Sequence, residues 1–146
     1  MKRTGIKRKP AKRKPRPRGV YCQERTRCPR KRMEGEKWCP KHTADHLCRA
    51  LVMERDKTCR RCGSRDSLQW AHLLSRRYGH VRADPRNSMV LCAPCHLWQT
   101  HNPIEGEEFF IYQIGQAAWD ENRARALHTG KIDHEAIIAS LRKETE

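Results

Sequence analysis

Two pairs of cysteines have the spacing of a zinc knuckle. Cys59 and Cys62 form one Cys-x-x-Cys pair, and Cys92 and Cys95 form the second, with twenty-nine residues between the two pairs. One such pair places two thiolates about one edge of a tetrahedron apart, so two pairs complete a four-cysteine site. The alternatives are a redox pair or reduced thiols that only pack. The repeated spacing favours structural zinc, because a basic chain with few apolar residues is not expected to build a large hydrophobic core and a bound metal can stabilise its fold instead.

A second set of possible ligands precedes the first. Its members are Cys22, Cys28, Cys39 and His42. Cys39 and His42 have knuckle spacing and Cys22 and Cys28 are further apart, so we predict a second structural Zn²⁺ site of three cysteines and one histidine. The alternative is a basic loop in which these cysteines merely pack. Cys48 is left over and is expected to be a buried thiol.

Three further residues could take part in chemistry. His72 and Asn87 lie between the two Cys-x-x-Cys pairs, and His96 directly follows the second pair. Taken singly, His72 could be an ordinary hydrogen-bonded histidine of a strand, and Asn87 could be a turn residue. His96 alone could be only a neighbour of a zinc ligand. Their joint order, in WAHLLSRR (70–77), VRADPRN (81–87) and LCAPCH (91–96), resembles HNH endonucleases of the zinc-knuckle type over residues 56–104. Residues 101–103, His-Asn-Pro, also recur in phage members. More loosely, residues 109–141 are similar to the helical ends of phage recombination proteins of the NinG/Rap kind.

The resemblance implies a ββα-metal finger, two short strands and a helix around one catalytic divalent ion, and hydrolysis of DNA phosphodiester bonds. His72 would accept a proton from the attacking water. His96 would hold the ion, expected to be Mg²⁺, Mn²⁺ or Ni²⁺. Asn87 would brace the loop that carries His72 and fix its imidazole. The residues expected to bind flanking phosphates are Arg76, Arg77 and Arg82.

One position departs from the family pattern. Many members place a second metal ligand, Asp, Glu or His, directly before the general-base histidine, and here that residue is Ala71. The alternatives for a second ligand are Asp84, His101, water or the phosphate itself. His101 lies five residues after His96, about 140° around a helix, so the two share no helical face.

Short elements must position these groups. Strand-like segments at 68–72 and 88–91 flank a polar loop, and Pro94 suits the start of a helix that ends at Asn102-Pro103. We also predict a helix to about residue 55 capped by Thr43 or Asp45, a helical region over 105–127 broken near Gly115, and a helix over 133–143 capped by Asp133. The expected fold class is a small, metal-stabilised α+β protein with C-terminal helices.

Charge divides the chain of 146 residues, whose formal net charge is +15. Residues 1–19 hold ten Lys and Arg and no acid, and three prolines. We predict a disordered, DNA-tethering tail there, with a solvated tail as the alternative. The other predicted segments are a zinc-binding segment with a helix at 20–55, the nuclease core at 56–104 and an acidic helical extension at 105–146.

The function expected from these features is a metal-dependent DNA endonuclease that nicks or cuts duplex DNA, from a bacteriophage. The alternatives are a zinc-stabilised DNA-binding protein without catalysis, such as a regulator or packaging adaptor, and a branched-DNA resolvase. An RNA-binding protein is disfavoured, since no aromatic stacking platform is evident. Apolar runs are too short for a membrane span or secretory signal. We therefore expect a cytoplasmic protein, with phage packaging or recombination proteins as candidate partners.

Overall fold

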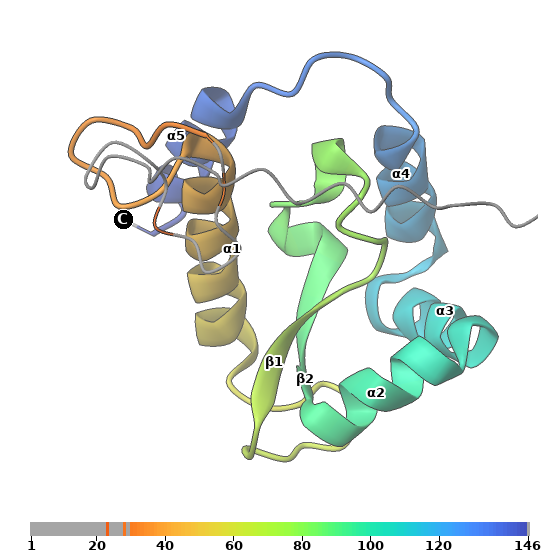
Figure 1. The fold of residues 1–146 in the computed structure, drawn as a ribbon. Coiled ribbons are helices and arrows are strands. Elements are labelled where there is room, and N and C mark those ends of the chain that lie inside the picture. Colours follow the sequence, from red (N-terminus) through yellow and green to blue (C-terminus); the bar gives the residue numbers. More distant parts are fainter. Residues whose placement is uncertain (1–22, 24–27, 29, 146) are drawn as a thin grey trace, which may run out of the picture.

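The computed structural model describes residues 23, 28 and 30–145 (Figure 1). The predicted basic tail at 1–19 lies outside the described residues. Within them are five α-helices and one two-stranded sheet, the small α+β architecture that the sequence predicts. The elements in chain order are α1 (Pro40–Asp56), β1 (Leu68–His72), β2 (Ser88–Cys92), α2 (Ala93–His101), α3 (Pro103–Ile114), α4 (Gln116–Ala126) and α5 (His134–Lys143).

An antiparallel ribbon of β1 and β2 forms the centre of the protein. Leu68 pairs with Cys92 at one end of the ribbon, and His72 pairs with Ser88 at the other. Every residue of β2 is buried, which is why its sequence is an apolar run rather than an alternating one. The long 73–87 loop, which joins the two strands, contains two short 3₁₀ helices at Gly79–Val81 and Pro85–Asn87.

Helices cover both faces of this ribbon (Figure 1). Val90 points toward α1 and α5, where it packs in a cluster with Val52 and Ile138. Met89 and Leu91 point the other way, into a cluster that the helices α2–α4 complete; its other members include Ala71, Phe110 and Trp119. Successive side chains of a strand face opposite ways, so β2 is the shared wall of two small apolar cores.

The predicted helix ends are mostly confirmed. The break at Gly115 occurs at a left-handed φ of 85°, which glycine adopts without a steric penalty. The side chain of Asp133 caps α5, accepting from the backbone N–H groups of Glu135 and Ala136 at 3.0 and 2.9 Å. No helix in the described part of the chain combines the length and the apolar character that crossing a membrane requires.

The predicted start of α1 was wrong. The helix begins at Pro40, with Cys39 in an extended conformation before it, rather than at a cap formed by Thr43 or Asp45. Proline suits the first turn because the N–H it lacks would have no partner there. Thr43 is buried within the helix, and Asp45 forms the ion pair described below.

Candidate metal centres and the histidine site

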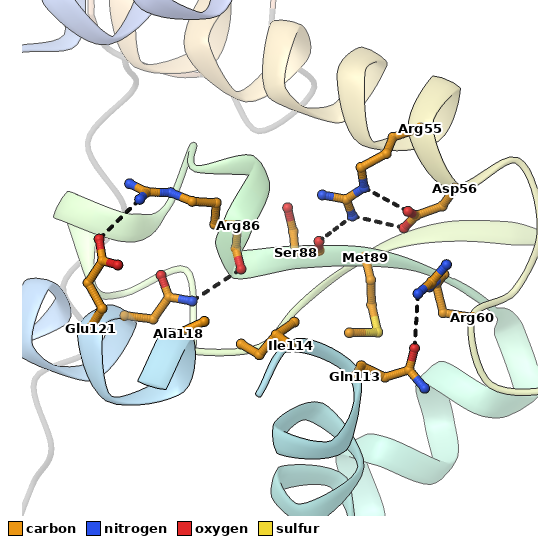
Figure 2. Close-up of a pocket in the computed structure, with 11 residues that line it drawn as sticks. Arg55, Asp56, Arg60, Arg86, Ser88, Met89, Gln113, Ile114, Ala118 and Glu121 are labelled. Carbon is orange, nitrogen blue, oxygen red and sulfur yellow. Dashed lines mark hydrogen bonds and ion pairs between the residues drawn. The ribbon is translucent and has the colours of Figure 1, made fainter. Parts of the chain in front are cut away.

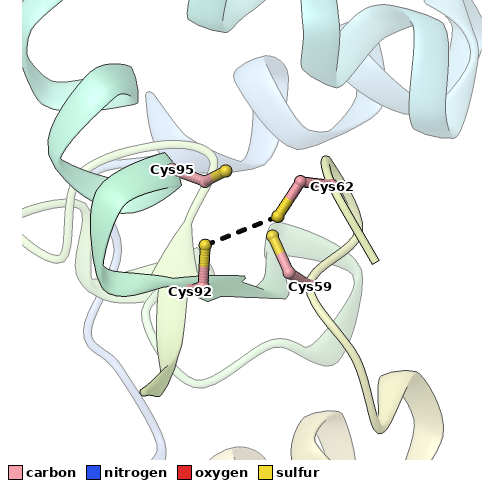
Figure 3. Close-up of side chains that lie close together, drawn as sticks. All are labelled: Cys59, Cys62, Cys92 and Cys95. Atoms are coloured by element: carbon pink, nitrogen blue, oxygen red, sulfur yellow. Dashed lines mark hydrogen bonds between the residues drawn. The ribbon is translucent and has the colours of Figure 1, made fainter. Parts of the chain in front are cut away.

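The four cysteines of the two knuckles come together at one end of the ribbon (Figure 3). Their sulfur atoms all lie within 4.8 Å of one another, and those of Cys62 and Cys92 are 3.6 Å apart. A Zn–S bond of about 2.3 Å implies a tetrahedral edge of roughly 3.8 Å. The cluster of Cys59, Cys62, Cys92 and Cys95 could therefore hold a metal ion such as zinc.

Backbone contacts fix the first knuckle against the rest of the fold. The N–H of Arg60 donates to the carbonyl of Val90 in β2 at 2.9 Å, and Gly63 N–H closes the turn onto Cys59 O at 2.8 Å. The guanidinium of Arg61 lies over the ring of Trp98 at 3.7 Å. These contacts tie the knuckle both to the sheet and to α2, the helix that carries Cys95.

The pKa values of Cys59 and Cys95 are shifted in opposite directions. Burial raises the pKa of Cys59, but hydrogen bonds from the backbone of Cys92, Cys62 and Arg61 outweigh it and bring the pKa down to about 6. Burial raises the pKa of Cys95 to about 12, with Arg61 opposing the shift. A divalent cation among the sulfur atoms would favour the thiolate form of all four.

A second group of ligands lies where α1 begins. Cys28, Cys39 and His42 bring their ligand atoms within 4.8 Å of one another. The sulfur atoms of Cys28 and Cys39 are 3.8 Å apart, and His42 Nδ1 lies 3.5 Å from the Cys39 sulfur. This group could hold a metal ion with a fourth ligand. Cys22, the predicted fourth ligand, lies outside the described residues.

His72 ends β1 at the opposite end of the ribbon from the four cysteines. Its Nε2 donates to the carbonyl oxygen of Arg82 at 3.0 Å, because a carbonyl can only accept. The proton therefore sits on Nε2, and Nδ1 retains a lone pair. Burial lowers the pKa of His72 to about 4; the Arg82 carbonyl opposes this shift and the charge of Arg76 adds to it. The imidazole is thus neutral near pH 7.

Asn87 braces the loop that follows His72. Its side-chain amide donates to the carbonyls of Leu74 and Val81 at 3.1 and 2.9 Å, and its oxygen accepts from Leu74 N–H at 2.9 Å. Asn87 is completely buried, so losing these bonds would leave several polar groups unpaired. Its amide holds the segment leading to Arg82, and the imidazole itself is held by the Arg82 carbonyl.

His96 lies in the first turn of α2, beside the last zinc-knuckle cysteine. Its Nδ1 donates to the side-chain oxygen of Gln69 in β1 at 2.8 Å, which leaves the Nε2 lone pair for a metal. Burial and then the charge of Arg76 lower the pKa of His96. The charge of Arg76 thus lowers the pKa of both imidazoles, which are held by different partners, the Arg82 carbonyl and Gln69.

No second ligand of a catalytic ion is in place among the described residues. Ala71 is completely buried in the apolar core, and Asp84 forms ion pairs with Arg86 and Arg125. Neither group of three or more clustered ligands in the described part includes His72 or His96. The sequence offered Asp84 and His101 as candidates for the second ligand. Asp84 is paired with two arginines, and His101 is the exposed last residue of α2, outside both ligand groups.

The three predicted phosphate-binding arginines differ in their surroundings. Arg76 and Arg77 are exposed, whereas Arg82 forms a bidentate ion pair with Asp45 of α1, at 2.6 to 3.1 Å. This corrects the expectation for Arg82, since its guanidinium is occupied inside the protein. The sequence did not reveal Asp45 or Gln69 as positioning residues, because each acts on a partner more than twenty residues away.

A separate cleft of about 360 Å³ lies among α1, β2 and the α3–α4 junction (Figure 2). Arg55 binds Asp56 at its wall, Arg86 binds Glu121, and Arg60 donates to Gln113. Its arginines are therefore engaged by neighbouring side chains. Neither the cysteine clusters nor His72 and His96 line this cleft, so it is distinct from the histidine site.

No family model matches this sequence, and neither a curated protein nor a solved structure matches it. The resemblance to HNH endonucleases therefore stays a prediction from the residues of the motif.

Proposed function

We propose that this protein is a metal-dependent DNA endonuclease of the HNH type, with β1, β2 and α2 serving as its ββα-metal finger. The observation that carries the proposal is the hydrogen bond from His72 Nε2 to the Arg82 carbonyl. That bond selects the tautomer with a free Nδ1 lone pair, which a general base needs to take a proton from water. Such an arrangement is not required for zinc binding or for simple DNA binding.

Each residue of the motif has one task in this proposal. His72 accepts the proton of the attacking water at Nδ1. Asn87 keeps the loop in the shape that presents the Arg82 carbonyl to His72. His96 offers Nε2 to a divalent ion, and its contact with Gln69 fixes the ring, as is common for metal-bound histidines.

The catalytic ion would supply charge neutralisation at the scissile phosphate and at the leaving oxygen. The chain itself provides His96 as its one firm ligand. Mg²⁺ commonly keeps several waters and binds through few protein ligands together with substrate phosphates. A site completed by the DNA phosphate is therefore consistent with Ala71 at the position before His72, and it implies weak binding of metal in the absence of DNA.

Charge supports DNA as the substrate. The chain carries a formal net charge of +15, and ten cations without an acid lie in residues 1–19. Near the histidines, Arg76 and Arg77 are exposed on the 73–87 loop. Guanidinium groups bind phosphate oxygens through paired hydrogen bonds, so these two side chains would hold phosphates that flank the cut.

Nicking of supercoiled plasmid tests the proposal. We expect wild-type protein to nick DNA with Mg²⁺, Mn²⁺ or Ni²⁺ and to stop when no divalent ion is added, while its tightly bound zinc is retained. His96→Ala should lose this activity without losing zinc. His128→Ala, a histidine in the α4–α5 linker, is the matched control and should cut like wild type. Metal-independent nicking, or full activity of His96→Ala, would contradict the assignment.

A second candidate is a zinc-stabilised DNA-binding protein without catalysis. The observation that favours it is Ala71, which is fully buried and cannot bind metal. In that case the protein would bind duplex DNA with the same affinity in the presence or absence of Mg²⁺ and would not nick it under any of these conditions.

A further inference from the structure

We propose that the cleft between α1 and the segment around the end of β1 is a binding subsite for the DNA backbone, with Arg49 as its phosphate contact from α1. The inference rests on the proposed function only in taking DNA as the ligand. It extends the DNA-binding surface beyond the predicted finger, onto a helix that the motif does not include.

The cleft has a volume of about 220 Å³ and is open to solvent. One wall is a single face of α1, with side chains at positions 42, 45, 46 and 49, which share a helical face. The other wall is formed by Trp70 of β1 and by Arg76 and Arg82 of the following loop. The two walls come from segments far apart in sequence, and α1 lies alongside the ribbon in Figure 1.

The charge balance of the cleft is positive. Asp45 is its one acid, and the bidentate contact with Arg82 neutralises that carboxylate. Arg49 and Arg76 are exposed, and neither guanidinium has a hydrogen bond or an ion pair within the described part of the chain. Two uncompensated guanidinium groups across one cleft suit a phosphodiester, whose oxygens accept paired hydrogen bonds.

The cleft adjoins His72. The ring of Trp70, in its wall, lies 4.1 Å from the imidazole of His72, and the carbonyl of Arg82 holds that imidazole at 3.0 Å. Successive phosphates of one DNA strand are about 3.4 Å apart along the helix axis. A strand with its scissile phosphate at His72 would therefore place a neighbouring phosphate over this cleft.

Duplex DNA fits the cleft better than a small anion does. The cleft is open to solvent, and its two free cations are exposed rather than enclosed in a pocket. A small anion usually needs burial and several converging donors. A polyanion gains instead from release of counterions at each contact, which makes its binding depend steeply on salt.

Fluorescence anisotropy of the full chain with a labelled duplex of about 20 base pairs, two helical turns, tests the subsite. Titrations at several salt concentrations, without added divalent ion, give an affinity and a salt slope. Arg49→Gln should weaken binding several-fold and lower the slope by about 0.9, the value for one phosphate contact. Adding Arg76→Gln should lower it by about 0.9 again.

The matched control is Lys143→Gln, which removes one positive charge from the exposed end of α5. It should leave the salt slope as in wild type. Arg49 is an exposed helical residue and glutamine is an equally good helix former, so melting temperature and zinc content should not change in Arg49→Gln. An Arg49→Gln slope equal to that of Lys143→Gln would overturn the proposal.

A cleavage assay distinguishes a failure of this subsite from a failure of the proposed catalytic function. At sub-saturating DNA, Arg49→Gln should cut more slowly than wild type in proportion to its weaker binding, whereas Lys143→Gln should cut at the wild-type rate. If His72→Ala cut normally, the proposed nuclease function would fail while the binding result at Arg49 stood. If Arg49→Gln bound like wild type and His72→Ala lost cleavage, the subsite alone would fail.

Discussion

The two ends of the central ribbon differ in how they assemble their chemical groups. At the Leu68–Cys92 end, four sulfur atoms lie within 4.8 Å of one another, and each pair of ligands comes from one short turn. At the His72–Ser88 end, His72 is held by a carbonyl ten residues away. His96 lies nearer the cysteine end, one residue after Cys95, where Gln69 of β1 holds its imidazole.

This difference matches the difference between structural and catalytic metal sites. A structural zinc site is closed by four protein ligands, whereas a catalytic site keeps positions open for water and substrate. The cysteine cluster supplies a complete tetrahedral set. In the proposed function, His72 would be an oriented base and His96 an oriented ligand, and the site would be completed only when substrate binds.

The largest expected effect comes from breaking the closed end. Cys59→Ser should release zinc and unfold the centre of the protein, because structural zinc contributes about 10–16 kcal/mol of apparent binding free energy in small zinc domains. Zinc content by mass spectrometry and circular dichroism would measure this. Cys48→Ala removes a buried thiol outside both clusters and should keep its zinc and its fold. Folded, zinc-loaded Cys59→Ser protein would contradict the structural role of the cluster.

A smaller effect is expected at the second group of ligands. Cys39→Ser should lower the zinc content from about two ions per chain to one, since each closed site holds one ion. The ribbon and its two cores should stay folded, because neither core cluster includes Cys39. Hydrogen exchange should show loss of protection confined to the region before α1 and its first turn. Wild-type protein with a single zinc ion would refute the second site.

The smallest of these effects is a pH dependence at the open end. His72 has a pKa of about 4 when folded, against 6.5 ordinarily, so between these values the unfolded chain binds a proton that the folded chain does not. Stability should therefore fall as pH falls through this window. At pH 5 wild type should lose about 2 kcal/mol relative to His72→Gln, compared with pH 7. Parallel urea titrations at both pH values would measure the difference.

The sequence predicted the local features well, because their causes are local. The knuckle spacing, the break at Gly115 and the cap at Asp133 each depend on a few neighbouring residues, and the structure confirms the last two together with the clustering of the four cysteines. The strands were also predictable, since β2 is buried on both faces and its sequence is apolar.

Features that depend on distant partners could not be predicted. Arg82 looked like a free phosphate ligand, but Asp45 lies opposite it only because α1 packs beside the ribbon. Asp84 was a candidate metal ligand in the sequence, but in the fold its carboxylate forms an ion pair with Arg125 of α4. A sequence does not show which charged side chains pair with each other. Only the fold shows whether a given side chain is free to bind a phosphate or a metal ion.

Single-turnover cleavage by His72→Ala tests the central claim most directly. With saturating DNA and Mg²⁺ or Mn²⁺, the variant should keep its zinc and its DNA affinity and stay folded at the assay temperature. Its cleavage rate should nevertheless fall at least ~100-fold, as expected when a general base is removed. Cleavage at the wild-type rate by folded, zinc-loaded His72→Ala would contradict the division of the ribbon into a structural end and a reactive end.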